Sequence, residues 1–175
     1  MHAIPEVARG VLVSIRPRYV SRILAGHKTV ELRRRFPEAA IIGARALIYS
    51  SSPVSAVVGC ARIKHVLKLP VSEIWKEHGA EACVSKQEFD AYFAGLRFGF
   101  AIFFDCVQEL RKHIKANDLE AQFRIVPPQS YRYVTNECLA SLSDDQFQTS
   151  NRHKRHNRAR RRGARSSIAG RLSTP

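Results

Sequence analysis

The sequence lacks the two features that most directly mark membrane or secreted proteins. Its apolar runs fall well short of the roughly 18–20 residues that a membrane-spanning helix needs. The first residues also lack the basic, apolar and small order of a signal peptide, because Pro5, Glu6 and Arg9 interrupt it. We therefore expect a cytoplasmic protein that has no membrane partner.

Cysteine spacing typical of a zinc site is also missing. None of the four cysteines forms a CxxC pair with another; they are Cys60, Cys83, Cys106 and Cys138. The pattern of zinc ribbons and treble clefs is therefore absent. We expect four reduced thiols, mostly packed in the core, with no metal site and no cofactor.

Acidic residues are missing from the end of the chain. Residues 151–175 contain nine Lys and Arg but no Asp or Glu, whereas residues 1–150 contain 20 basic and 15 acidic residues. Of the formal net charge of +14, +9 therefore belongs to the last segment and +5 to the rest. Dense like charges with few apolar anchors predict a disordered basic tail.

This tail favours nonspecific contact with nucleic acid, because cations attract phosphate backbones with little sequence preference. The arginines expected to make that contact are Arg155, Arg158, Arg160, Arg161 and Arg162. A purely solubilising segment, or an accident of the reading frame, is the alternative interpretation.

Enough apolar sequence is present for one domain. Hydrophobic residues make up 45% of the chain, and a folded part of about 130–150 residues buries roughly two-thirds of its unfolded surface. We expect a single domain over residues 1–150, with its core at about 11–135, followed by the tail at 151–175.

The order of the predicted elements indicates an α+β fold. Apolar, β-branched runs predict strands at 11–15, 29–35, 44–50, 54–69, 97–107 and 129–135, with a further extended stretch near 110–119. Helical spacing and capping residues predict helices at 17–25, 72–79, 85–95 and 136–147. Because no β-α-β rhythm is present, we expect a mixed β-barrel of five or six strands with two or three short peripheral helices.

One charged segment forms a distinct pattern. Residues 26–33 read Gly-His-Lys-Thr-Val-Glu-Leu-Arg and fit GxKxxExR. Alternate residues of a strand share a face, so one polar face is expected to hold Thr29, Glu31, Arg33 and Arg35. Lys28, at the preceding turn, reaches the same face. A carboxylate between cations eases their clustering, and guanidinium forks suit phosphates or base edges. From the residues alone, a solvated face with weak ion pairs is the alternative.

Two further polar segments are candidate ligand contacts. Ser51 and Ser52 lie in a turn that suits the floor of a cleft, although plain turn chemistry is the alternative. Gln129, Ser130 and Arg132 accompany two tyrosines, and such groups stack on and hydrogen-bond to unpaired bases. The alternative for the tyrosines is that they close the barrel as core anchors.

The pattern at 26–33, placed after a predicted helix and opening a strand, resembles the ASCH domain (activating signal cointegrator homology). This family is a branch of the PUA-like β-barrels. Segments 11–17, 47–53, 89–95 and 127–133 resemble bacterial, archaeal and phage members in the same order. The resemblance covers roughly residues 11–135. It implies a PUA-like barrel with a cleft, lined by the motif, for RNA or a nucleotide-like ligand.

Pattern and resemblance together give one set of expected ligand contacts. They are Lys28, Glu31, Arg33, Arg35, Ser51, Ser52, Gln129, Ser130 and Arg132. Our first interpretation is an RNA-binding protein that is not an enzyme. A transcription-regulatory interaction module is a further alternative.

The resemblance also implies an enzymatic alternative. Some small ASCH proteins remove the acetyl group of N4-acetylcytidine with a Lys, a Thr and a Glu. Lys28 matches the Lys, Glu31 stands at the Thr position, and Glu81 is the nearest acid for the third role. Glu31 cannot replace a hydroxyl nucleophile in the same step. A metal-independent hydrolase of a nucleoside or of RNA would use Lys28 and Glu31 as catalytic residues, with Glu31 or His27 moving protons.

Overall fold

The computed structural model describes residues 10–37 and 41–143 of the chain. In chain order its elements are β1 (Gly10–Ile15), α1 (Pro17–Leu24), β2 (Val30–Arg33), β3 (Arg45–Ser50), β4 (Ala56–Pro70), α2 (Val71–Ala82), α3 (Lys86–Phe93), β5 (Phe98–Lys115), α4 (Ala116–Phe123), β6 (Tyr131–Val134) and α5 (Asn136–Ser143). The α+β class is confirmed, and six strands agree with the expected five or six. The described residues contain five helices, whereas we expected two or three short peripheral ones. The basic tail and its arginines, Arg155, Arg158, Arg160, Arg161 and Arg162, lie outside the described residues.

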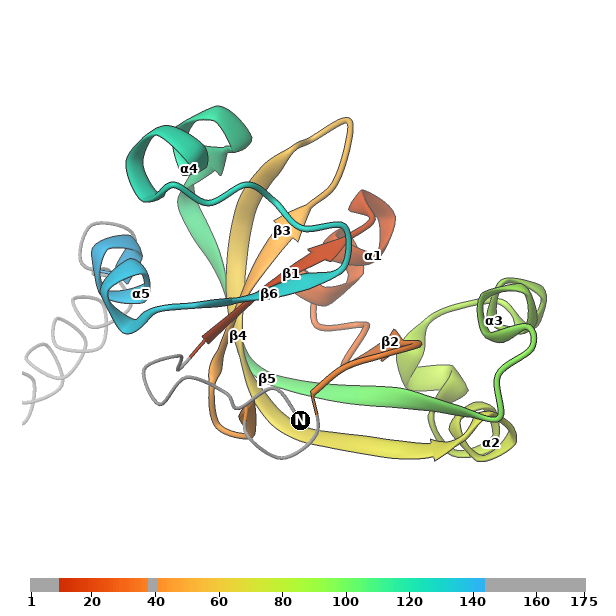
Figure 1. The fold of residues 1–175 in the computed structure, drawn as a ribbon. Helices are drawn as coiled ribbons and strands as arrows, with labels where there is room; N and C mark the ends of the chain where they lie inside the picture. The colour runs from red at the N-terminus through yellow and green to blue at the C-terminus, as the bar shows by residue number, and fades with distance from the viewer. Residues whose placement is uncertain (1–9, 38–40, 144–175) are drawn as a thin grey trace, which may run out of the picture.

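The six strands form one mixed sheet in the order β2-β5-β4-β3-β1-β6. β1 and β3 run parallel, and the other neighbours are antiparallel. The long strands β4 and β5 carry several register shifts, and Figure 1 shows them curving through the molecule. β2 and β6 stand at opposite ends of the sheet order, so the described strands do not close into the barrel that we expected.

Side chains span the two sheet edges where a backbone ladder would have closed a barrel. Arg33, the last residue of β2, donates through Nη1 to the carbonyl oxygen of Ser130, just before β6, at 3.3 Å. Its Nη2 donates to the carbonyl oxygen of Ser14 in β1 at 2.7 Å. The rings of Phe36 and Tyr131 also meet edge to face, with centroids 4.9 Å apart. We call this region between β2 and the β1–β6 edge the seam.

Three apolar clusters hold the helices on the sheet. One packs α1 against alternate residues of β1, β3, β4 and β5, including Val13, Ile48 and Ile102. The second lies on the opposite faces of the same strands and contains Leu119 of α4 and Leu139 of α5. The third lies under α2 and α3, at the far end of the β4–β5 pair (Figure 1).

Local sequence signals explain most element ends. Pro17 occupies the first turn of α1, and Gly26 follows the helix with φ +77°, a conformation that glycine adopts without strain. At the start of α3, Ser85 and Glu88 form a complete capping box. α2 runs through Gly79, where we expected it to end. The Trp75 ring packs on this glycine so closely that a Cβ there would lie only 3.0 Å from it.

Candidate functional site

A cleft of about 1150 Å³ opens at the seam, with α1 and α3 at its sides. Of the nine ligand contacts expected from the sequence, seven line it: Lys28, Glu31, Arg33, Arg35, Ser51, Gln129 and Ser130. Ser52 does not, since it lies exposed in the turn beyond β3. Arg132 does not line it either. Tyr131 faces the seam, so strand alternation places Arg132 on the other side of β6, where it donates to the Val126 carbonyl at 3.2 Å.

Three charged side chains of the motif are buried beneath this cleft. Lys28, Glu31 and Arg33 are only 2%, 7% and 6% exposed, and no other charged residue of the described ranges is buried. Glu31 lies between the two cations, with Oε2 at 3.3 Å from Lys28 Nζ and Oε1 at 3.1 Å from Arg33 Nη2. The alternative of a solvated charged face is therefore wrong. We call these three residues the buried triad.

Lys28 joins the triad to helix α2. Its Nζ donates to the carbonyl oxygens of Val30 and Ala82, both at 2.7 Å, and faces Glu31 as a third acceptor. Three acceptors match the three N–H groups of an ammonium. Since Ala82 is the last residue of α2, the Lys28 charge also lies at the negative end of the helix dipole.

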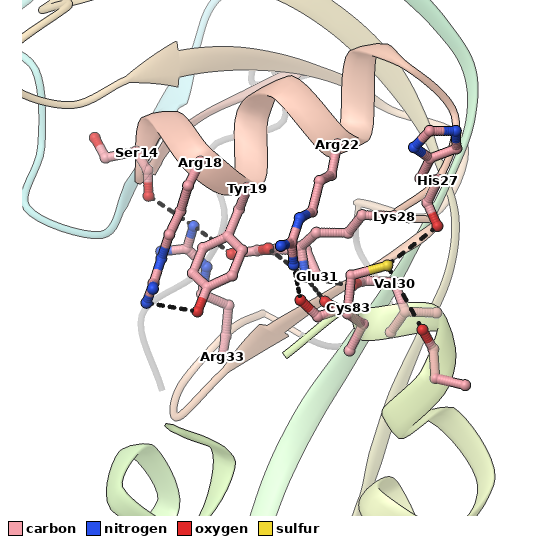
Figure 2. A network of polar contacts seen from close by, with 12 residues as sticks. Ser14, Arg18, Tyr19, Arg22, His27, Lys28, Val30, Glu31, Arg33 and Cys83 are labelled. Atoms are coloured by element: carbon pink, nitrogen blue, oxygen red, sulfur yellow. Dashed lines mark hydrogen bonds and ion pairs between the residues drawn. The ribbon is translucent and has the colours of Figure 1, made fainter. Parts of the chain in front are cut away.

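Two more contacts fix the same helix end. Arg22 of α1 donates through Nη1 to the Cys83 carbonyl at 2.5 Å, and the Thr29 amide donates to the Glu81 carbonyl at 3.2 Å. Figure 2 shows Arg22, Lys28 and Cys83 side by side between α1 and the end of α2. Lys28 and Thr29 of the motif therefore hold the end of α2, which is followed by α3, against the floor of the cleft.

Arg33 holds the floor at the seam. Besides Glu31 and Ser14, its guanidinium contacts the Ser130 carbonyl and hydroxyl oxygens, each at 3.3 Å. These four acceptors surround the two Nη atoms. The fifth donor, Nε, is buried and has no hydrogen-bond partner among the described residues. Buried donors are nearly always paired, so Arg33 retains capacity for one more acceptor.

An ion pair spans the sides of the cleft. Arg18 of α1 lies 2.6 Å from Glu88 of α3, Nη2 to Oε1, and both residues line the cleft. Arg18 also packs over the Tyr19 ring at 4.6 Å and donates to its hydroxyl at 2.9 Å. Glu88 Oε2 accepts the Ser85 amide at 3.1 Å in the capping box. The hydrogen bonds from Ser85, and the nearby Arg18 charge, lower the pKa of Glu88.

Several residues of the cleft were not predicted as site residues. They are Ser14, Arg16, Arg18, Tyr19, Arg34, Glu88 and Tyr92. In a continued strand Arg34 would lie on the face opposite Arg33, but β2 ends at Arg33 and the alternation ends with it. Thr29, expected on the polar face, is exposed and outside the cleft lining.

Tyr92 contributes an aromatic ring and a hydroxyl to the α3 side. It is 40% exposed, and its hydroxyl oxygen accepts the Arg34 amide at 3.3 Å. Burial raises the pKa of Tyr92, while the Arg33 charge opposes that rise. The hydroxyl is therefore a neutral donor beside the arginines at neutral pH.

The charges that line the cleft are unbalanced. Six cationic residues (Arg16, Arg18, Lys28, Arg33, Arg34 and Arg35) face two acidic ones (Glu31 and Glu88). A cleft with this excess concentrates anions. Within residues 10–37 and 41–143, no group of three or more His, Cys, Asp and Glu side chains is arranged to hold a metal ion. None of the helices in that part of the chain is long and apolar enough to cross a membrane.

Comparison with known proteins assigns the chain to one family. The family profile described as "ASCH domain" matches residues 13–120. The chain belongs to the ASCH domain family. A protein of Zymomonas mobilis named "ASCH domain-containing ribonuclease" is 34% identical over 143 residues, which are 81% of this chain and 95% of that protein.

Solved ASCH structures share the architecture described above. The crystal structure of ASCH from Zymomonas mobilis is similar with a TM-score of 0.73 and 31% identity, over 79% of this chain and 96% of that one. The N-terminal domain of Staphylothermus marinus McrB has a TM-score of 0.55 and covers 81% and 97% of the two chains. At 12% identity, that second resemblance concerns the fold alone.

Of the residues named for the enzymatic alternatives, Lys28 and Glu31 line the cleft, whereas Glu81 and His27 do not. Glu81, the nearest acid for the third role, lies outside the lining, with its carboxylate 3.0 Å from His78 Nδ1. His27 is exposed and also outside the lining. Lys28 has its three donors engaged, and both oxygens of Glu31 face cations.

Proposed function

We propose that this chain binds single-stranded RNA in the cleft, with backbone phosphates on the arginines that line it. The observation that carries the proposal is the excess of six cationic over two acidic residues around one cleft. Its volume of about 1150 Å³ exceeds the roughly 300–1,000 Å³ of ordinary small-molecule pockets, so it suits more than one nucleotide. Phosphate contacts supply most of the sequence-independent affinity for nucleic acids.

Aromatic side chains favour unpaired RNA as the ligand. The rings of Tyr19, Tyr92 and Tyr131 line the cleft beside the arginines. Base–aromatic stacking is the usual way to hold single strands, and it is tolerant of sequence. Among the arginines, Arg34 and Arg35 follow directly after β2 and are exposed, whereas Arg33 is buried at the floor. In this proposal Lys28 and Glu31 set the shape of the cleft and do not contact the RNA.

Salt-dependent binding by the full chain tests this proposal. The double variant Arg34→Gln/Arg35→Gln removes two exposed cations of the cleft, and Arg97→Gln/Arg111→Gln removes two exposed cations outside it. Each phosphate contact adds about 0.7 to the slope of log affinity against log salt for single strands. We expect the cleft variant to lower that slope by about 1.4 and the control to leave it almost unchanged.

The same comparison separates cleft binding from general charge effects, because both variants retain the tail and have equal net charge. Equal losses in the two variants would assign the affinity to net charge or to the tail. No binding of a short single-stranded RNA by the wild type at low salt would end the proposal.

Cleavage of RNA is a second candidate function, favoured by the name of the 34% identical Zymomonas relative. Arginines beside a phosphodiester stabilise the charge that develops during its cleavage. Incubation of the full chain with end-labelled single-stranded RNA, resolved on a denaturing gel, tests it. Cleavage is supported if the amount of product falls at least tenfold in the cleft double variant but persists in the control. If RNA is bound and keeps its full length, the chain binds RNA without cleaving it.

A further inference from the structure

The ion pair between Arg18 and Glu88 directly bridges the α1 and α3 sides of the cleft. Its atoms, Arg18 Nη2 and Glu88 Oε1, are 2.6 Å apart. Both side chains line the cleft and are partly solvated, with 51% and 37% exposure. Exposed pairs of this kind are weak, so a competing anion can displace one partner.

The two partners differ in their freedom to move. Glu88 is fixed, because Oε2 accepts the Ser85 amide at 3.1 Å and the Ser85 hydroxyl at 3.0 Å, while the Glu88 amide donates back to Ser85 Oγ at 3.2 Å. Arg18 is a long side chain held only by Glu88 and by its neighbour Tyr19 among the described residues. A competing anion would therefore draw Arg18 away and leave Glu88 where it is.

The fixed Glu88 carboxylate has the opposite charge to most of the ionisable residues that line the cleft. It is one of two acidic residues in the lining, and the other, Glu31, already lies between two cations of the buried triad. Glu88 has no second cation at comparable distance among the described residues. Once Arg18 has turned to an entering anion, the Glu88 carboxylate is no longer paired. Its negative charge then repels that anion.

We propose that Glu88 is an internal competitor of the RNA phosphate, occupying Arg18 in the free protein, and that Arg18 takes a backbone phosphate when RNA binds. The carboxylate oxygen held by Arg18 then marks a position where the cleft accepts an oxyanion. Glu88 thus lowers the affinity for RNA, because a phosphate must compete with its carboxylate for Arg18. A ligand therefore needs negative charge to displace that carboxylate. This inference rests on the proposed RNA binding and goes beyond it by assigning these two residues.

Glu88→Gln in the full chain is the direct test, since Gln at this position keeps the capping box while removing the charge. RNA affinity at low salt is expected to rise about two- to fivefold, the range of one exposed ion pair. Asp90→Asn is the matched control, because Asp90 is an exposed acid of the same helix that pairs with Lys86 and does not line the cleft. It should leave the affinity unchanged.

Arg18→Gln completes the cycle. It should weaken binding and lower the salt slope by about 0.7, the contribution of one phosphate contact. In that background, Glu88→Gln should gain less than in the wild type, since no arginine remains to be released. Unchanged fluorescence of Trp75, which packs on Phe89 of α3 with centroids 5.1 Å apart, verifies that each variant is folded.

The outcomes separate this inference from the proposed function. If RNA binds in the cleft but Glu88→Gln has no effect, lowers affinity, or gains no more than Asp90→Asn, the internal competitor is refuted and RNA binding stands. If the wild type and Glu88→Gln both fail to bind RNA, the proposed function itself fails.

Discussion

Replacing Glu31 by glutamine removes the one negative charge of the buried triad while keeping the shape of the side chain. The carboxylate has a cation on each oxygen, Lys28 at 3.3 Å and Arg33 at 3.1 Å. After the substitution, two cations with 1% and 8% exposed side chains would remain together without a counter-charge. The folded state should therefore lose stability.

The size of the loss follows from the burial of the three side chains. Removing one partner of a buried ion pair costs about 3–5 kcal/mol, because the other charge stays desolvated. The amide oxygen of Gln still accepts one hydrogen bond, which places the expected loss at ~3 kcal/mol. That is a large fraction of a typical stability of about 5–15 kcal/mol, and corresponds to a fall in Tm of ~10 °C for a domain of this size.

Urea unfolding followed by the fluorescence of Trp75, the single tryptophan, measures this change. Glu81→Gln is the matched control, because Glu81 is 48% exposed and contacts only His78 through its carboxylate among the described residues; its loss should stay below ~1 kcal/mol. The reasoning is refuted if Glu31→Gln unfolds within ~1 kcal/mol of the wild type, since the triad would then behave as weak surface pairs.

Three further predictions concern the capping box, the thiols and a strained residue. Because the pKa of Glu88 is lowered from 4.5 in the folded state, its stabilisation of α3 is complete above about pH 4.5 and is lost as pH falls through the lower folded value. An NMR titration of the Ser85 amide should show that transition, and Glu88→Gln should abolish it. A colorimetric thiol reagent should modify exposed Cys106 first, while Cys60 and Cys138, whose pKa values burial raises, should react only on unfolding; equal rates would contradict this. Arg124→Gly should stabilise the chain by about 0.5–1 kcal/mol in thermal unfolding, because Arg124 follows α4 with φ +54°, and a lower Tm would contradict that account.

Local patterns predicted much of the fold. Pro17 and Gly26 bound α1, and the Ser85 capping box starts α3, because these signals act within one turn of helix. The motif at 26–33 also indicated that Lys28, Glu31 and Arg33 would gather on one face. Each of these predictions depends only on residues close together in the chain.

Such local patterns could not predict contacts between residues that are far apart in the chain. Arg33 meets Ser130, 97 positions away, and Lys28 caps a helix that ends 54 positions later, so their burial cannot be deduced from spacing. Whether the sheet closes into a barrel depends on which strand edges pair, and those edges lie far apart in the chain. Helix α4 was missed because the pattern at 110–119 favours an extended stretch and a turn, whereas β5 continues to Lys115 and the helix follows directly.

Backbone amide shifts of the ¹⁵N-labelled full chain, titrated with a short single-stranded RNA, test most directly whether RNA occupies the cleft. Our account predicts that the largest changes fall on residues lining it, such as Arg33, Arg35, Tyr92 and Ser130. Changes confined to residues 151–175, or to the exposed faces of β4 and β5, would contradict it.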